Sequence, residues 1–193
     1  MCSLSFRTLG SVAVGFALAV QLLSARADVK VEFDKNFDFR SIRTWSWSPT
    51  GAGDVKMART INDDPDAVKQ QFEPILLDAV AKEMKARGLV GVTEAGDVQV
   101  TYYLLLSTTM SAQTLGQFLP ATPEWGLPPF APATQSIEMM NKGSLVLDLS
   151  VKEKIVWRGV AQEKVKFDVD NRRREELLRE GVRDLLRRYP PRR

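Results

Sequence analysis

Alternation of apolar and polar residues at every second position constrains the fold of this 193-residue chain more than any other feature of its sequence. The pattern runs through residues 97–107, where Val98, Val100 and Tyr102 fall on one face of an expected strand. It returns in residues 29–34, 43–48, 143–149 and 155–161, and Gly51 and Gly53 are interpreted as the turn that ends the second of these segments. A period of two sends successive side chains to opposite faces, so each segment predicts a strand with one buried and one solvent-exposed face.

Two other segments follow the helical period. Asp64 before Pro65 predicts the start of a helix that ends at Gly88, with Pro74 marking either a kink or the start of a new helix. A cap at residue 170 or 171 predicts a second helix that continues to Tyr189. The order strand, helix, strand around the first helix favours a parallel crossover, and residues 143–161 favour a β-hairpin.

These elements predict an α+β fold with a mixed, mostly antiparallel sheet of four to five strands and two helices packed on one face. Residues 28–193 are expected to form a single domain, because a chain of this length buries enough surface without disulfides or a structural metal. Trp157 is predicted to be a core residue. Trp45 and Trp47 are open to two interpretations, a ligand-stacking platform or a cover over the core, and such pairs are more often cover.

The N-terminal segment, residues 1–27, has the pattern of a signal peptide. Arg7 precedes an apolar run from Leu9 to Leu23, and small residues at 25 and 27 predict cleavage before Asp28. A retained anchor is the alternative, although about 15 apolar residues fall short of the roughly 20 that span a bilayer. Cys2 precedes the apolar run, so it is not placed for lipidation. The expected location is periplasmic or envelope-associated, with no transmembrane span in the mature chain.

Charge and composition exclude several classes of function. Cleavage leaves a net charge of +1, because Arg7 and Arg26 are lost from 27 basic residues while all 24 acidic residues remain. That balance argues against nucleic-acid binding, which depends on neutralising phosphates. The chain has no histidine, and its one cysteine is Cys2. We find no motif for a catalytic triad, a metal, a nucleotide or another cofactor, so a non-enzymatic protein is predicted.

Two acidic groups have competing interpretations. Residues 62–66 resemble a calcium loop only superficially, since they lack its glycine and distal glutamate, and a helix cap is the better interpretation. Asp148 and Glu153 could form a carboxylate pair for acid–base chemistry, but both are expected to be ordinary surface residues of the hairpin. The arginine-rich last helix could bind anionic lipid, but interleaved acids favour a solvated face.

A proline-rich insertion at about 108–141 is the candidate interaction segment. Phe118, Trp125 and Phe130 lie among its five prolines and are possible partner-binding residues. Two alternatives remain open: the rings fold back over the end of the sheet, or the stretch is a disordered insertion.

Several blocks of the sequence resemble the bacterial domain of unknown function 4136 family of envelope proteins and lipoproteins. They are residues 31–47, residues 96–102, residues 142–159 and the closing Tyr189-Pro190-Pro191. The resemblance implies export and an α+β fold, and it brings no established activity or catalytic residues. Unlike many relatives, this chain has no cysteine directly after its apolar run, and its middle loop is rich in proline rather than glycine.

Two classes of function remain. The first is a non-enzymatic envelope interaction or scaffold module, which binds another envelope protein or a cell-wall component. The alternative is a carrier for a lipidic or apolar small ligand, which requires a cavity of several hundred Å³. A chain of this size is expected to have one filled core, with no room for such a cavity, and this expectation favours the interaction module.

Overall fold

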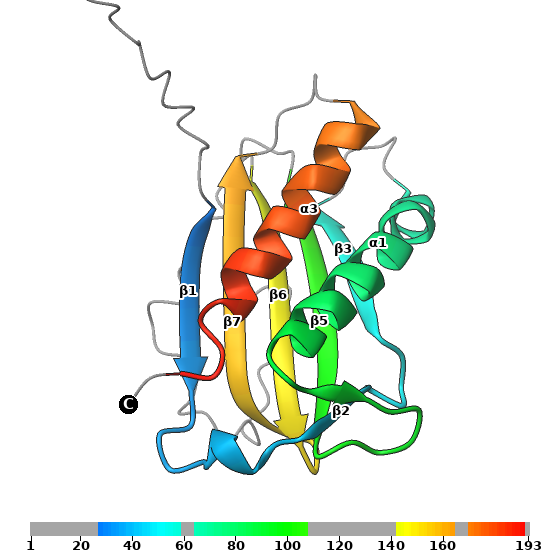
Figure 1. The fold of residues 1–193 in the computed structure, drawn as a ribbon. Coiled ribbons are helices and arrows are strands. Elements are labelled where there is room, and N and C mark those ends of the chain that lie inside the picture. The colour runs from blue at the N-terminus through cyan, green and yellow to red at the C-terminus, as the bar shows by residue number, and fades with distance from the viewer. Residues whose placement is uncertain (1–26, 59–63, 108–141, 165–169, 192–193) are drawn as a thin grey trace, which may run out of the picture.

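The computed structural model describes residues 27–58, 64–107, 142–164 and 170–191, which form a single mixed sheet and two long helices (Figure 1). The strands are β1 (Asp28–Phe33), β2 (Thr44–Trp47), β3 (Gly53–Ala58), β4 (Val90–Gly91), β5 (Val98–Ser107), β6 (Lys142–Val151) and β7 (Lys154–Lys164). The helices are α1 (Pro65–Ala86) and α3 (Asn171–Leu186), with a short 3₁₀ turn, η1 (Phe39–Ser41). The α+β class predicted from the sequence is therefore confirmed.

The sheet runs in the order β1-β7-β6-β5-β2-β4, and β3 also pairs with β5. The long strands β1, β7, β6 and β5 pair antiparallel, and these pairings contain most of the paired residues. Strands β2 and β3 run parallel to β5, as the expected crossover through α1 requires. The sheet has seven strands in the described residues, against the predicted four to five.

The larger strand count comes from β3 and β4. Strand β3 follows β2 after a turn at Gly51, and the two strands pair with successive halves of β5. Gly53 begins β3 so close to Tyr102 that a Cβ atom would lie 2.2 Å from the Tyr102 carbonyl oxygen. Gly51 and Gly53, which suggested the end of β2, therefore also allow β3 to begin. Strand β4 has two residues, too few for a periodic signal.

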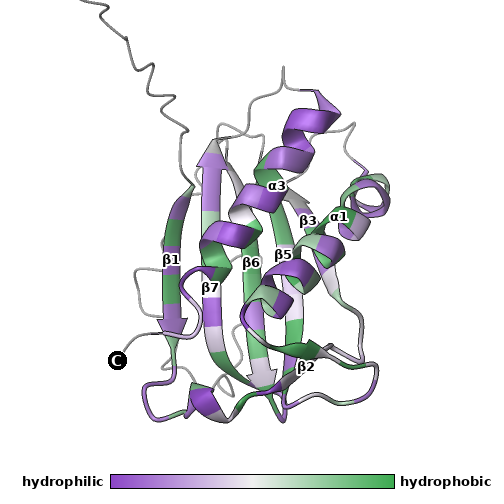
Figure 2. Ribbon diagram, viewed as in Figure 1, coloured by the Kyte–Doolittle hydropathy of each residue, from purple (hydrophilic) through white to green (hydrophobic). Residues whose placement is uncertain are grey.

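Both helices lie in front of the sheet in the view of Figure 1, and the apolar core fills the space between these layers. Leu76, Val80 and Met84 of α1 and Leu185 of α3 are buried there against the sheet. The outward side of α3 is mostly hydrophilic (Figure 2). This division of polarity explains why α3 packs on the sheet through one stripe.

The helix boundaries follow the predicted signals. The Asp64 carboxylate accepts hydrogen bonds from the backbone N–H groups of Asp66 and Ala67, which confirms the cap. Helix α1 continues through Pro74 as one element, and Gly88 ends it with a positive φ of 78°. Helix α3 begins after Asp170, whose side chain accepts from the N–H of Arg173.

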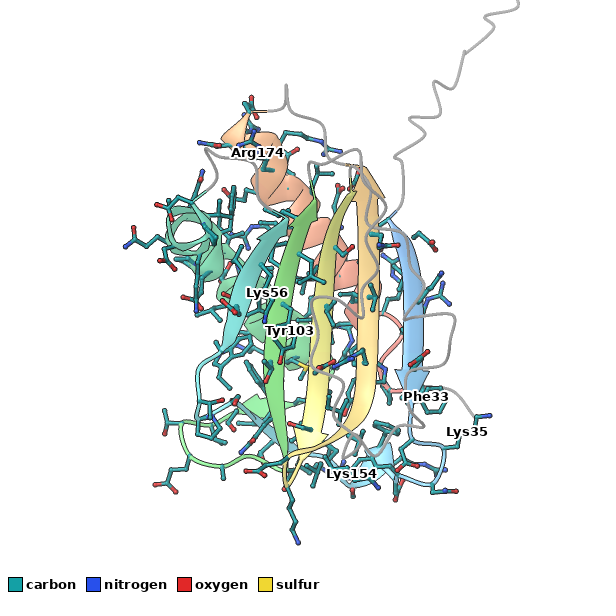
Figure 3. The ribbon with its side chains drawn as sticks, turned by 180° about the vertical axis from the view of Figure 1, so that it is seen from behind. Phe33, Lys35, Lys56, Tyr103, Lys154 and Arg174 are labelled. Carbon is teal, nitrogen blue, oxygen red and sulfur yellow. The ribbon has the colours of Figure 1, made fainter. Side chains whose placement is uncertain are left out.

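The prediction of one solvent-exposed face is wrong for the centre of the sheet. Figure 3 shows the face of the sheet opposite the helices, over which no helix of the described residues lies. Leu105, Val146 and Val160 alternate with core residues that face the helices, so they lie on this face, and yet they are at most 1% exposed. The alternating pattern predicted the wrong environment because several positions expected to face solvent carry apolar side chains. The buried polar side chains on this face pair with each other across β6 and β7. The central strands are thus buried on both faces.

Candidate binding site

Four buried polar side chains on the face opposite α1 and α3 form two pairs across strands β6 and β7. Asp148 and Arg158 occupy directly opposed positions, and the Arg158 guanidinium donates to both carboxylate oxygens through Nε and Nη2. Four residues along each strand on the same face, beyond the Val146–Val160 pair, Gln162 Nε2 donates to Ser144 Oγ at 2.9 Å. All four side chains are buried. A buried charge must be paired to be tolerated, and this arrangement pairs it.

The expectation that Asp148 is an ordinary surface acid is therefore wrong. Burial raises the pKa of its carboxyl, and the adjacent Arg158 guanidinium opposes that rise. A general base must reach its substrate with a free oxygen, whereas Arg158 occupies both oxygens of Asp148. Glu153 lies in the turn between β6 and β7, where its φ of 65° is left-handed, and it is exposed. The two carboxylates do not form an acid–base site.

A hollow of about 440 Å³ opens at the end of β1, between the start of the domain and its C-terminal segment. We call it the aromatic hollow. Its lining consists of residues 33–35, 37–40, 187 and 189–191. It brings together the end of β1, the turn leading into η1 and the segment after α3. Figure 3 shows Phe33 and Lys35 at this end of β1.

Local hydrogen bonds set the conformation of the turn that forms one wall of the hollow. The Asp34 side chain accepts from the N–H of Asn36 at 2.9 Å, and its backbone oxygen accepts from Phe37. The Asp38 carboxylate then caps η1 by accepting from the N–H of Arg40. Short acidic side chains commonly stabilise turns in this way. Because of these bonds, Phe37 and Phe39 are carried on a defined backbone.

The aromatic rings of the hollow form a continuous edge-to-face series that reaches the core. The ring centroids are 4.9 Å apart for Phe37 and Phe39, and 5.9 Å apart for Phe39 and Tyr189. Tyr189 lies 5.9 Å from Trp157, which is fully buried. Phe33 joins the series through Phe39 at 6.1 Å. Such pairs favour a fixed geometry, so the walls of the hollow are anchored to the core.

The rim of the hollow carries charges of both signs, most of which have a partner. Asp34 lies 3.6 Å from Lys154, Arg40 lies 4.0 Å from Asp38, and Arg187 lies 3.2 Å from Asp184. These distances join exposed or partly exposed groups and contribute little to stability. Apolar walls with a mixed polar rim are the usual composition of a binding surface.

Tyr189 contributes a phenolic side chain to the lining of the hollow. Burial raises the pKa of the Tyr189 hydroxyl to about 12, so this group stays protonated near neutral pH. Among the described residues, no group of three or more acidic, cysteine or histidine side chains is placed to hold a metal ion. No helix in the same ranges is long and apolar enough to cross a bilayer.

The site residues predicted from the sequence are not among those that the structure describes. Phe118, Trp125 and Phe130 fall outside the described residues, as do residues 1–26 of the expected signal peptide. Trp45 is buried, Trp47 is half-buried, and their rings stack edge to face beside the core, in agreement with the structural interpretation of the pair. The aromatic hollow was missed, although the apolar residues 33, 37 and 39 around an otherwise polar turn were a visible signal.

A second pair of distant segments is joined by Asp97, just before β5. One carboxylate oxygen of Asp97 accepts from the backbone N–H groups of Arg43 and Thr44 at 2.9 and 2.8 Å. Thr44 Oγ1 in turn accepts from the N–H of Asp97 at 3.0 Å. These bonds hold the start of β2 to the start of β5. The hydrogen bonds lower the pKa of the Asp97 carboxyl, first through the Arg43 N–H.

Comparison with known proteins gives a family and a fold. The model of the family described as domain of unknown function (DUF4136) matches residues 29–191. No curated protein matches the chain by sequence.

Similar folds occur in several solved structures. A DUF4136 family protein from Bacteroides thetaiotaomicron has a TM-score of 0.50 at 14% identity, over 86% of this chain and 96% of that one. A PDZ domain protein from Parabacteroides distasonis has a TM-score of 0.53 at 14% identity; the match covers 86% of this chain but 36% of that longer one. A match to a minor lipoprotein from Acinetobacter baumannii is too weak to indicate a shared fold, with a TM-score of 0.26 at 10% identity, over 71% of this chain and 87% of that one.

Proposed function

The chain belongs to the DUF4136 family, and we propose that it is a non-enzymatic interaction module of the bacterial envelope that holds a polypeptide partner in the aromatic hollow. An envelope location is supported by the N-terminal segment, in which Arg7 precedes a long apolar run and small residues follow it. The absence of histidine from the sequence, together with a cysteine only at position 2, supports a role that does not depend on catalysis.

The observation that carries the proposal is the rigid aromatic lining of the hollow. Rings that are already fixed by contact with the core lose little freedom when a partner binds, so their contact area is used efficiently. Aromatic side chains are also frequent among the residues that contribute most to protein interfaces. Phe37 and Phe39 lie at the accessible end of this series, and both are half-buried.

A polypeptide suits the hollow better than a lipid does. The charged rim formed by Lys35, Asp38 and Arg40 offers partners of both signs to backbone and side-chain groups. An acyl chain would gain nothing from these charges. The prolines at positions 190 and 191 add flat apolar surface beside the rings.

A carrier of a small apolar ligand is the second candidate, because the volume of the hollow falls within the roughly 300–1,000 Å³ of small-molecule sites. The space between the helices and the sheet supports this candidate less. There, the described side chains Leu76, Leu147 and Leu185 are fully buried in one packed cluster.

Native mass spectrometry of the protein isolated from its envelope, before and after organic extraction, separates the two functions. The proposal predicts no extractable small molecule and a co-isolated polypeptide that is lost from Phe37→Ala. Val90→Ala is the matched control, because Val90 is an exposed apolar residue at the opposite edge of the sheet. A stoichiometric small ligand that extraction removes would support the carrier instead.

A further inference from the structure

Strand β1, with six residues, forms one edge of the sheet in the part of the chain that the structure describes. It pairs with β7 on one side, and none of the described residues pairs with its other side. The N–H of Asp34 donates to Val156 O, so in this antiparallel ladder the even-numbered residues direct their backbone groups toward β7. The N–H and C=O groups of Val29, Val31 and Phe33 therefore point away from the sheet, into the free edge.

The side chains of odd-numbered and even-numbered residues of β1 lie on opposite faces of the sheet. Val29, Val31 and Phe33 pack against the apolar core, so they lie on the helix side. Lys30 and Glu32 occupy the opposite face, with opposite charges two residues apart. An edge of this kind recognises an extended strand through its backbone and selects that strand by the charges beside it.

A second copy of β1, in one antiparallel register, provides both the backbone pairing and the complementary charges. If Val31 lies opposite Val31 of the second copy, Val29 lies opposite Phe33, and every outward N–H and C=O group of both strands finds a partner. The same register places Lys30 opposite Glu32 of the second copy, twice. Shifting the register by two residues in one direction places Lys30 opposite Lys30 of the second copy. Shifting it in the other direction places Glu32 opposite Glu32 of the second copy. Like charges directly opposite each other are destabilising.

We propose that two copies of this protein associate through β1, antiparallel and centred on Val31, so that their sheets become one. The helices of both copies then lie on the same side, and the apolar residues of β1 extend the core across the junction. The ends of the pairing bring Asp28 near Asp34 of the second copy, where Lys154, 3.6 Å from Asp34, offsets the repulsion. This proposal does not depend on what occupies the aromatic hollow.

The opposite border of the sheet is less suited to such pairing. It is divided between the two-residue β4 and the separate strand β3. Lys69 Nζ also donates to the Gly53 backbone oxygen at 2.8 Å, which uses an acceptor of that border. Short and interrupted edges resist pairing with other chains.

Sedimentation equilibrium of the protein, as the cell processes it, tests the proposal. The expected mass is that of two chains, decreasing to one on dilution. Lys30→Glu and Glu32→Lys should each give single chains, because each places like charges opposite one another. An equimolar mixture of the two variants should restore the double mass, since each Glu then faces a Lys.

Val31→Pro is the second disrupting variant, in case Glu32→Lys does not fold. Proline at this position removes an outward N–H but none that bonds β7, so the variant should keep its circular dichroism spectrum and become a single chain. A single-chain mass for the wild type at all concentrations would overturn the proposal, as would Lys30→Glu or folded Val31→Pro keeping the double mass. A mixture of folded charge variants that stays single-chain would also overturn it. Phe37→Ala should keep the double mass, so failure of this proposal is distinguishable from failure of the function proposed for the hollow.

Discussion

Asp148 on β6 and Arg158 on β7 form a two-point ion pair between directly opposed residues, on the face of the sheet that carries no helix of the described chain. Their side chains are 4% and 1% exposed. Burying an isolated charge costs several kcal/mol, so each of these residues requires the other. The pair fixes the register of β6 against β7, because a one-residue slip of either strand would send that strand's member of the pair to the apolar face and separate the two charges.

Removing one member of this pair should destabilise the protein strongly. Asp148→Leu or Arg158→Met is expected to lower the free energy of unfolding by about 3–5 kcal/mol, because the remaining charged group stays buried without its partner. The double variant Asp148→Leu/Arg158→Met should lose less than either single variant. Urea denaturation of the three proteins measures the coupling. Additive losses in the double variant would show that the two side chains act independently.

Trp157 should be one of the most costly side chains to truncate. It is fully buried beside Tyr189 and belongs to the core between α3 and the sheet. Trp157→Ala is expected to lower the free energy of unfolding by about 3–5 kcal/mol. Trp47→Ala is the matched comparison, since Trp47 is half-buried, and it should cost clearly less. Equal losses in chemical denaturation would mean that Trp157 is not packed more closely than Trp47.

Asp97 should make stability dependent on acid pH. Its pKa is lowered in the folded protein by hydrogen bonds from the N–H groups of Arg43 and Thr44, relative to about 3.9 in the unfolded chain. A lowered folded-state pKa gives stabilisation that is present above the unfolded value and is lost as the pH falls through the folded value. Asp97→Asn should remove that contribution and flatten the acid side of the stability profile. A variant profile parallel to that of the wild type would contradict this role.

Gly96 should not tolerate a side chain. A Cβ atom at this position would lie 2.6 Å from the backbone carbon of Trp45, and backbone cannot move aside as a flexible side chain does. Gly96→Ala should therefore separate β2 from the start of β5 and lower the thermal midpoint by several degrees. Gly91→Ala is the control, since its Cβ would meet the Trp45 ring at an ordinary 3.4 Å. Equal midpoints for the two variants would be contrary to this packing.

Most of the fold was predictable because its signals are local. The alternation located β1, β2, β5, β6 and β7, and the Asp64 cap and Gly88 stop located α1. Strand β3 was missed because Gly51 and Gly53 were interpreted as the end of a strand, whereas the close approach of Tyr102 requires glycine at position 53. A requirement set by a residue 49 positions away in the chain leaves no local pattern.

The functional surfaces were harder to predict than the elements. The aromatic hollow joins residues 33–40 to residues 187–191, and no spacing rule relates the two ends of a chain. The burial of Asp148 was missed for a similar reason, because its partner Arg158 lies on another strand and a charged residue in an alternating pattern normally faces water. Phe118, Trp125 and Phe130 remain a prediction, since they lie outside the described residues.

The most direct test of the proposed function is photo-crosslinking in the intact cell, with a photoreactive phenylalanine analogue replacing Phe37 in the hollow. The same analogue at Val90, at the opposite edge of the sheet, is the control. We predict that position 37 crosslinks to one defined polypeptide, identified by mass spectrometry, and that position 90 does not. Crosslinking of position 37 to lipid, or to the same products as position 90, would contradict the account.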